Sequence, residues 1–441
     1  MTVSRLDQFY RSILVSKFFT KGWGKPENIK KLYQIRQSMR DRDKCYALVS
    51  KNHPIQIDKE EEQSDCFILS GHFKSPFAEH LPGVVPEASE NAYFQMLLPK
   101  TWKTSLRPLC LHLAGTGDHY FWRRRTFMAK PLLKEYGIVS LIFDYMARGN
   151  LKINRSNLHN VSDIFVMGGC LALESIALFN WCERQGFGPL GITGISMGGH
   201  MACIAAGVWP KPVVLVPCLS WTTASCVFTQ GVMSACIPWQ LLQNQYFTND
   251  NYHGEIRKLI GPLTKKAQED SNHFEKHFDL AKMNSGTITP HEDSLKQLKN
   301  DRLDRMFNLP TRLASTKTES SAEQRGKTDS LSKKDLMTGE ALQFMNSIMD
   351  EFTHLANYDT PVDTSLVIVI AAKDDAYVLR DGVEDLTHLW KGAELRLIDS
   401  GHVAAFIFNQ KLFRKAISDG FERLTQKYNL ENNPVEARME K

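Results

Sequence analysis

The chain has 441 residues, of which 42% are hydrophobic and 23% are charged. This composition is typical of a globular protein and excludes a fibrous or mainly disordered chain. The formal net charge of +5 is too small for a strongly basic nucleic-acid-binding protein, so we expect no nucleic-acid partner. The nine cysteines form no CxxC pair, and Cys110, Cys170 and Cys203 lie in apolar runs. We therefore expect buried thiols in a reducing, intracellular compartment rather than disulfides or a zinc site.

The first 40 residues are unusually basic. They carry nine Lys or Arg side chains but only two acids, Asp7 and Glu27, so their formal charge is +7 and that of the remaining chain is −2. Apolar side chains recur there at helical spacing, with Lys17 interrupting them; they are Leu6, Phe9, Tyr10, Ile13, Leu14 and Phe18. We predict a basic amphipathic segment over residues 1–60. Two interpretations stay open: a helix that binds a membrane surface or directs the chain to mitochondria, and a helix that packs on the rest of the protein.

Short apolar runs then alternate with helical patterns, which predicts an α/β fold with a mainly parallel sheet flanked by helices. The predicted strands are 67–69, 93–98, 109–113, 138–143, 190–193, 213–216, 366–370 and 395–398. The predicted helices are 119–136, bent or divided at Pro131, then 162–186 with Ser162 as its N-cap, 197–208, and a closing helix over 404–428.

An insertion interrupts the α/β domain that we predict over residues 61–430. It spans 218–345, and its first part forms a cap, whereas 265–335 is so rich in charged and small polar residues that we expect disorder. His273 and His277 lie in this part, but two ligands are too few for a metal site, and we expect neither metal nor cofactor. No apolar stretch is long enough to predict a membrane-spanning helix; the nearest candidate, 212–249, is uncharged but interrupted by Pro, Gly and polar residues.

The sequence Gly194-Ile195-Ser196-Met197-Gly198 matches the pattern GxSxG, between a predicted strand and a predicted helix. This motif turns sharply, exposes the serine hydroxyl at the start of the helix, and needs glycines where strand and helix backbones approach each other. Ser196 is therefore the candidate nucleophile, and the alternative is a tight turn without catalysis. Oxyanion stabilisation would come from the backbone N–H of Met197 and of Thr116, which lies in the glycine-rich loop after strand 109–113.

Two acids and one histidine follow the last two predicted strands. Asp374 and Asp375 come after strand 366–370, and the position of Asp375 three residues before Val378 favours it, with Asp374 as the alternative. His402 follows strand 395–398, where a general base would take the Ser196 proton. The chain order Ser, Asp, His is one in which this triad occurs.

These motifs, together with longer runs, resemble the α/β hydrolase superfamily over about residues 64–424. The runs AGTGDHYFWRRR (114–125), VSDIFVMGG (161–169), GITGISMGGHMA (191–202), PCLSW (217–221) and KDDAYV (373–378) are similar to the family of alpha/beta hydrolase domain-containing protein 18. The resemblance implies the α/β-hydrolase fold, a serine-hydrolase activity and a triad of Ser196, Asp375 and His402.

Two features bear on the substrate. The uncharged stretch after Val216 is rich in apolar and aromatic residues, namely Trp221, Val227, Phe228, Val232, Met233, Ile237, Trp239, Leu241 and Leu242. An apolar cap suits an acyl chain, and the arginines at 123–125 suit an anionic headgroup; core packing and a solvated helix face are the alternatives.

We therefore predict a serine esterase or lipase that cleaves a phospholipid acyl ester at an anionic membrane surface, with cardiolipin of mitochondria as one candidate. Two alternatives stay open: an inactive hydrolase fold that acts as a binding or scaffold protein, and a serine hydrolase acting on peptides or thioesters. The oligomeric state is not encoded in any motif.

Overall fold

The computed structural model describes residues 4–13, 17–102, 105–118, 120–144, 158–261, 333–379 and 385–430. Nearly all of the stretch predicted to be disordered, 265–335, lies outside these ranges, so its disorder stays a prediction. Contacts divide the chain into two compact units, one of Met1–Thr264 with Glu340–Lys441 and one of Lys265–Gly339. The elements described below belong to the first unit, except for the first residues of helix α16.

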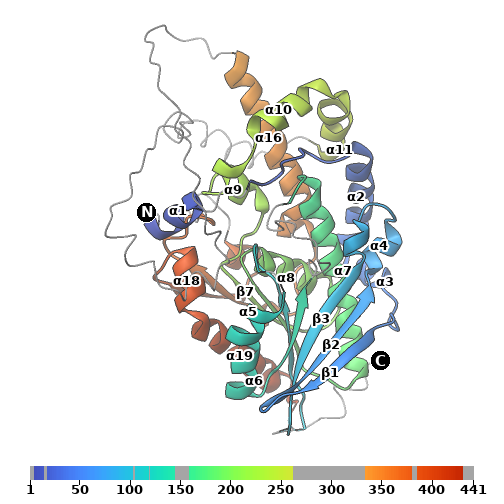
Figure 1. The fold of residues 1–441 in the computed structure, drawn as a ribbon, viewed down its shortest axis with the longest axis vertical. Coiled ribbons are helices and arrows are strands. Elements are labelled where there is room, and N and C mark those ends of the chain that lie inside the picture. The colour runs from blue at the N-terminus through green and yellow to red at the C-terminus, as the bar shows by residue number, and fades with distance from the viewer. Residues whose placement is uncertain are drawn as a thin grey trace. The chain divides into compact units, whose positions relative to one another are not determined.

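Among the described residues, nine strands form one sheet (Figure 1). They are β1 (Gln56–Glu62), β2 (Cys66–Lys74), β3 (Asn91–Pro99), β4 (Leu109–Leu113), β5 (Val139–Asp144), β6 (Leu190–Ile195), β7 (Val214–Cys218), β8 (Ile368–Ala372) and β9 (Glu394–Ile398). Their order across the sheet is β1-β2-β3-β5-β4-β6-β7-β8-β9. The strands β1 to β3 pair antiparallel, as β3 does with β5, and the other neighbours are parallel. The predicted α/β fold with a mainly parallel sheet is confirmed.

Helices cover both faces of the sheet (Figure 1). On one face lie α7 (Ser162–Arg184) and α8 (Met197–Val208), and on the other α6 (Lys130–Tyr136) and α19 (Gln410–Lys427). Two separate clusters of buried hydrophobic side chains correspond to these faces: in β7, Leu215 belongs to one cluster, and Val214 and Val216 to the other. Successive side chains of β7 thus point to opposite faces of the sheet, and both faces are buried. A strand buried on both faces is apolar at every position, which is why continuous apolar runs predicted the central strands.

The remaining helices lie around this framework. They are α1 (Arg5–Ile13), α2 (Pro26–Met39), α3 (Arg42–Ala47), α4 (Pro76–His80), α5 (Trp122–Arg124), α9 (Ala224–Thr229), α10 (Trp239–Thr248), α11 (Arg257–Ile260), α16 (Lys333–Thr353), α17 (Leu386–Leu389) and α18 (His402–Phe408). Of these, α9, α10 and α11 come from the part of the chain predicted to form a cap.

Helix α7 is long and apolar enough, by length and composition, to cross a membrane, and within the described residues it is the one helix that meets this test. The sequence analysis named another stretch, 212–249, as the nearest candidate, but there the chain forms β7, α9 and α10. Most of α7 is buried and packs against α8 and α4. Its apolar character on all sides therefore suits a core helix of this unit.

Some predicted element bounds were wrong for local reasons. The edge strand β1 was not predicted because its side chains are mostly charged and exposed, without apolar alternation. The closing helix begins at His402, two residues earlier than predicted, and is broken at Asn409 between α18 and α19. Ser162 is the first residue of α7 but makes no cap hydrogen bond; instead the Asp163 carboxylate accepts from the N–H groups of His159 and Asn160.

The helix predicted over 119–136 is divided, as expected, but the irregular turn precedes the proline. In the structure α5 begins at Trp122, and a π-helical turn over Arg125–Ala129 joins it to α6. Pro131 lies in the first turn of α6, where a residue without a backbone donor is tolerated. The predicted start, His119, lies outside the described residues.

The cysteines are buried as predicted, except for Cys236, which is half-buried. Cys110, Cys170 and Cys203 lie in the core, and all nine cysteines are free thiols. Burial raises the pKa of the Cys203 thiol, as well as that of Cys110, which disfavours reactive thiolates at these positions.

Residues 18–24 bind the basic N-terminal segment to the core. Phe19 and Trp23 are fully buried, and the ring of Phe19 lies 5.1 Å from that of Phe228. The indole N–H of Trp23 donates to the carbonyl oxygen of Leu242 at 2.8 Å, and its ring lies 4.7 Å from that of Phe344. Of the two interpretations of the segment, the structure thus shows packing on the protein for this part.

We predict that Trp23→Ala lowers the free energy of unfolding by about 3–5 kcal/mol, because it removes a buried ring and leaves the Leu242 carbonyl unpaired. Urea denaturation followed by circular dichroism measures this loss. The matched control is Trp122→Ala, since Trp122 is 47% exposed, and its expected cost is below about 1 kcal/mol. Equal stability of the two variants would contradict a docked N-terminal segment.

Candidate active site

Ser196 lies at a sharp turn between β6 and α8, in the middle of the sheet. Its backbone has φ 56° and ψ −122°, a conformation that residues other than glycine rarely adopt. Its N–H donates to the carbonyl oxygen of Cys218 at 2.8 Å, and its carbonyl accepts from the N–H of Gly199 at 2.9 Å. Hydrogen bonds on both sides thus hold the strained turn in place.

The glycines of the motif are needed because strand and helix approach closely. A Cβ on Gly194 would lie 2.2 Å from the carbonyl atoms of Gly198. A Cβ on Gly198 would lie 2.6 Å and 2.7 Å from the carbonyl oxygens of Leu113 and Ala114. No side chain fits against rigid backbone at these distances, which is the reason the sequence pattern suggested.

Asp375 and His402, which come from different loops, are brought together. The Nδ1 atom of His402 lies 2.7 Å from Oδ2 of Asp375, and both side chains are buried. The other oxygen, Oδ1, accepts from the N–H groups of Tyr377 and Val378, each at 2.8 Å. These bonds explain the spacing of three residues: the Asp375 carboxylate begins a turn and accepts a hydrogen bond from the backbone N–H of Val378 at its end.

The alternative acid, Asp374, has a different place. Its backbone N–H donates to the carbonyl oxygen of Ser400 at 3.1 Å, and its own carbonyl accepts from the N–H of Ser4 at 2.9 Å. The carboxylate that accepts from the His402 ring is that of Asp375. The structure therefore places Asp375, of the two acids considered, in contact with His402.

Two opposing effects act on the pKa of His402. Burial by itself lowers its pKa, but the charge and hydrogen bond of Asp375, with a smaller contribution from Asp7, raise the pKa above its usual value. Because a carboxylate only accepts, Nδ1 carries the proton and Nε2 holds the lone pair that a general base needs. The ring of Tyr377 lies 4.8 Å from the imidazole and covers it.

The two candidate oxyanion residues are neighbours. The hydroxyl of Thr116 lies 3.9 Å from the sulfur of Met197, which is the first residue of α8. A Cβ on Gly115 would lie 2.8 Å from the carbonyl oxygen of Ile195, so the loop after β4 approaches the turn directly. The arrangement brings the segments that carry both amides to one place; their role in catalysis stays a prediction.

The sequence analysis missed Asp7. This carboxylate of α1 is fully buried and accepts three backbone hydrogen bonds, from Ala376, His402 and Val403. Among the side chains of α1 that the structure describes, Asp7 and Arg11 are buried, whereas Leu6, Phe9 and Tyr10 of the predicted apolar stripe are half-buried. The sequence contained one signal for Asp7: it lies one helical turn before Arg11, and it is one of only two acids in the first 40 residues.

Of the three arginines at 123–125, Arg124 is not available to bind an anionic headgroup. Arg124 is buried, pairs with Asp118 at 2.8 Å and donates to the carbonyl oxygens of His112, Phe143 and Tyr120. Arg123 donates to the carbonyl oxygen of Gly117 at 2.8 Å, and Arg125 to the Gln95 amide at 3.1 Å. Because these guanidinium groups hold the fold together, both the predicted headgroup role and the alternative of a solvated face are wrong for Arg124.

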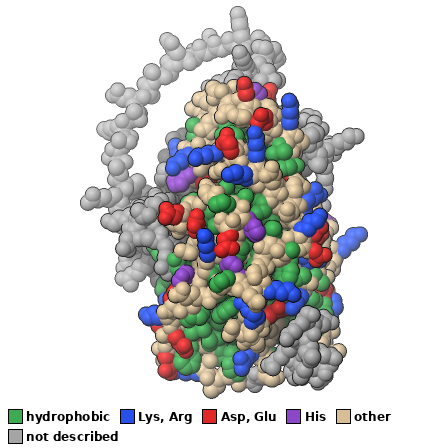
Figure 2. Space-filling view, turned by 90° about the vertical axis from the view of Figure 1, so that its right-hand side faces the viewer, with side chains coloured by type: hydrophobic (Ala, Val, Ile, Leu, Met, Phe, Trp, Pro, Cys, Tyr) green, Lys and Arg blue, Asp and Glu red, His purple; other side chains and the backbone are tan. Residues whose placement is uncertain are grey.

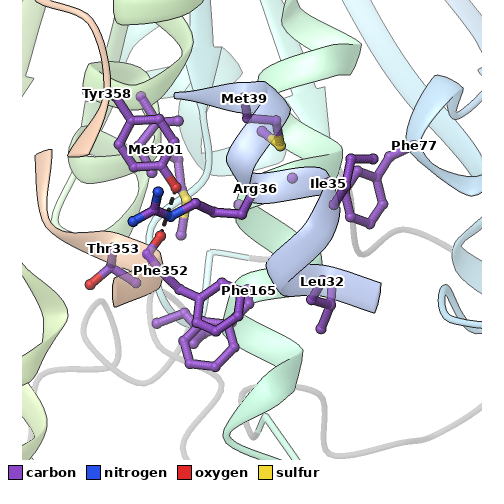
Figure 3. Close-up of a pocket in the computed structure, with 14 residues that line it drawn as sticks. Leu32, Ile35, Arg36, Met39, Phe77, Phe165, Met201, Phe352, Thr353 and Tyr358 are labelled. Carbon is purple, nitrogen blue, oxygen red and sulfur yellow. Dashed lines mark hydrogen bonds between the residues drawn. The ribbon is translucent and has the colours of Figure 1, made fainter. Parts of the chain in front are cut away.

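A small pocket lies away from the candidate triad, between α2, α7, α8 and α16. Its lining is mostly apolar and contains neither Ser196 nor His402. Figure 3 shows Arg36 reaching from α2 toward the segment that carries Phe352 and Tyr358. Its guanidinium pairs with the Glu351 carboxylate at 2.8 Å, and burial raises the pKa of Glu351 against the opposing effect of Arg36. This pair fastens α2 to the end of α16.

Among the described residues, no group of three or more His, Cys, Asp or Glu side chains is placed to hold a metal ion. His273 and His277 lie outside the described residues. The expectation that the chain needs neither metal nor cofactor stays a prediction.

The chain is similar to several solved hydrolases at low sequence identity. One is a putative hydrolase from Legionella pneumophila, with 13% identity, coverage of 87% of this chain and 95% of that chain, and a TM-score of 0.44. Another is a thermostable carboxyl esterase from Bacillus coagulans, with 14% identity, coverage of 76% and 97%, and a TM-score of 0.41. A third is a rice cell wall degrading esterase from Xanthomonas oryzae, with 14% identity, coverage of 85% and 94%, and a TM-score of 0.40.

A family model also matches most of the chain. The model of the family described as "Alpha/beta hydrolase domain containing 18" matches residues 16–423, which include all the predicted strands and the candidate residues Ser196, Asp375 and His402. The predicted resemblance is confirmed, and the chain belongs to the alpha/beta hydrolase domain containing 18 family.

Proposed function

We propose that the chain is a serine hydrolase that cleaves carboxylic esters through an acyl-enzyme. The observation that carries this proposal is the buried 2.7 Å pair of Asp375 and His402 in a chain whose Ser196 occupies a strained strand-to-helix turn. Such pairs orient a histidine toward a nucleophile, and strained turns persist at sites where they serve the chemistry. Membership in an α/β hydrolase family supports the same reading.

The proposed reaction proceeds in two halves. Ser196 Oγ attacks the ester carbonyl carbon while His402 Nε2 takes its proton, and the amides of Met197 and Thr116 bind the oxyanion. His402 returns the proton to the leaving alcohol, which departs and leaves an acyl group on Ser196. Water, deprotonated by His402, then releases the acid. Asp375 stays ionised throughout and stabilises the imidazolium that forms in each half.

The proposed substrate is a lipid ester, and the cap supports an apolar acyl group. The cap reaches the acid loop directly, since the N–H of Val232 donates to the carbonyl oxygen of Ala376 at 3.0 Å. A Cβ on Gly231 would lie 2.6 Å from the carbonyl oxygen of Tyr377, so the two segments touch. Much of the apolar cap lies in the core, as the packing alternative expected, but half-buried side chains such as Val232 remain beside the site.

An anionic phospholipid surface is the proposed setting, with mitochondrial membranes as the proposed location. The support comes from four exposed lysines within the first 40 residues, which are Lys17, Lys21, Lys25 and Lys31. Arg124 is left out of this role, because its buried guanidinium pairs with Asp118. On the face that Figure 2 shows, positive and negative side chains are interspersed, so the described part of that face offers no broad basic surface.

We predict that a fluorophosphonate probe labels the wild-type chain and that Ser196→Ala abolishes labelling. His402→Ala and Asp375→Asn should slow labelling and hydrolysis of a short nitrophenyl ester by about 10³–10⁴-fold, because the base is lost or held in the wrong tautomer. Circular dichroism confirms folding of each variant. Labelling that persists in Ser196→Ala would overturn the assignment of the nucleophile, and a folded but unreactive wild type would favour the inactive scaffold alternative.

The pH dependence follows from His402. Since its pKa is raised and only the neutral imidazole is a base, we predict that kcat/KM for the nitrophenyl ester rises with pH and is half-maximal above pH 6.5. In Asp375→Asn, the residual kcat/KM should be half-maximal at a lower pH than in the wild type, because the charge that raises the pKa of His402 is gone. A wild-type kcat/KM that is half-maximal below pH 6 would contradict a raised pKa of His402.

We predict that hydrolysis of phosphatidylglycerol vesicles exceeds that of phosphatidylcholine vesicles by roughly tenfold or more, since each lysine near an anionic surface contributes up to about 1 kcal/mol. Changing Lys17, Lys21, Lys25 and Lys31 to Glu should remove this preference while hydrolysis of a soluble ester persists. The matched control changes four exposed lysines outside the N-terminal segment, Lys74, Lys134, Lys391 and Lys411, to Glu. Equal rates on both kinds of vesicle would contradict the anionic-surface proposal.

A further inference from the structure

Helix α1 places one buried carboxylate between the two loops that carry the candidate acid and base. Oδ2 of Asp7 accepts from the N–H of His402 at 2.8 Å and from that of Ala376 at 3.1 Å, and Oδ1 accepts from the N–H of Val403 at 2.9 Å. Ala376 directly follows Asp375, and the other two donors begin α18. A single side chain thus joins both loops.

This carboxylate supplies what α18 itself lacks. The N-cap of α18 is Gly401, which has no side chain to accept from the first backbone N–H groups of the helix. A Cβ at Gly401 would lie 2.3 Å from the Ser4 side chain and 2.9 Å from Oδ2 of Asp7, so the glycine leaves room for α1. Figure 1 shows α1 beside α18.

The far end of α1 is fastened to the cap. Arg11 lies one turn after Asp7 and is buried; its Nε donates to the sulfur of Cys236 at 2.7 Å. Its guanidinium carbon lies 5.5 Å from the centre of the Phe18 ring. At the near end, the N–H of Ser4 donates to the carbonyl oxygen of Asp374 at 2.9 Å. Contacts at both ends, on the loops and on the cap, hold α1 against the site.

We propose that α1 is a latch on the triad and that Asp7 is its positioning residue, which fixes the acid loop against the histidine that begins α18. This inference rests on the proposed serine-hydrolase function. Asp7 touches neither substrate nor reacting atoms; it sets the distance between Asp375 and His402 through the backbone. It also adds a second negative charge near the imidazolium that forms during each half-reaction.

Proteolytic processing of the N-terminal segment would affect the triad. A protein that is cut between residues 13 and 17 and then loses the N-terminal peptide also loses Asp7, so its triad loosens. Active enzyme must therefore keep α1, and removal of α1 would switch the enzyme off. This conflicts with a targeting segment that is removed before the enzyme acts.

The test compares Asp7→Asn and Asp7→Ala with Asp363→Asn as a matched control. Asp363 also accepts a backbone N–H, that of Ser365, but it precedes β8 and thus lies at the strand end opposite to Asp375. We expect Asp7→Asn to lower kcat for a nitrophenyl ester about tenfold with KM nearly unchanged, and Asp7→Ala to lower it further.

The pH at which kcat/KM is half-maximal distinguishes a loss of triad positioning from a loss of stability. The acidic groups that act on His402 are Asp375 and Asp7, and the ring of Tyr377 covers it. Without the charge of Asp7, the half-maximal point of kcat/KM should move to lower pH, whereas Asp363→Asn should lower the denaturation midpoint and leave that point in place. An unchanged kcat and an unchanged half-maximal pH in a folded Asp7→Asn variant would overturn the latch.

A cleavage experiment avoids variants that fail to fold. A protease site inserted between Ser16 and Lys17 lets the folded enzyme be cut, and activity should fall at least tenfold once the N-terminal peptide is removed. A synthetic peptide of residues 1–16 should restore activity, and the same peptide with Asp7→Asn should not. Full activity after removal of the peptide would contradict the proposal. If the intact wild type is inactive on all esters, the proposed function fails, and the His402 pKa measured by NMR in Asp7→Asn then tests the latch alone: a lowered pKa supports it, and an unchanged one overturns it.

Discussion

The close contact between β6 and α8 is the constraint on which the site depends. Because the backbone of Gly194 meets that of Gly198, Ser196 has to adopt φ 56°, and the chain turns within one residue from strand to helix. This turn sits in the middle of the sheet, where β4 and β7 flank β6. The loop after β4 can then reach Met197, and loops after later strands can bring an acid and a histidine to the same edge.

The N-terminal segment completes this edge rather than standing apart from it. Phe19 and Trp23 bind the segment to the cap, and Asp7 binds it to the loops beside Asp375 and His402. Its basic side chains divide accordingly: Arg11 is buried against the cap, whereas lysines such as Lys17 stay exposed. One segment can therefore position the triad from its buried face and present positive charge from its exposed face, which joins the proposed chemistry to the proposed membrane surface.

Sequence patterns predicted the parts of the protein whose structure depends on residues that are close together in the chain. Buried parallel strands read as apolar runs, and the glycine pattern predicted the turn at Ser196 because backbone approach there allows no side chain. The spacing to Val378 favoured Asp375, because the N–H of Val378 donates to the Asp375 carboxylate. Asp7 could not be predicted in this way: its partners are backbone groups 369 to 396 residues away, and backbone groups leave no pattern in the sequence. Arg124 was misinterpreted for a related reason: its charge suggested a ligand, but its partners are the Asp118 carboxylate and backbone carbonyl oxygens.

The measurement that tests the central claim most directly is peptide mass spectrometry of the folded wild-type chain after reaction with a fluorophosphonate. A covalent mass added to Ser196 alone, at a rate that falls as His402 becomes protonated, is the result that this account predicts. An adduct on a different residue, or none on a folded chain whose α1 is intact, would contradict a working triad of Ser196, Asp375 and His402.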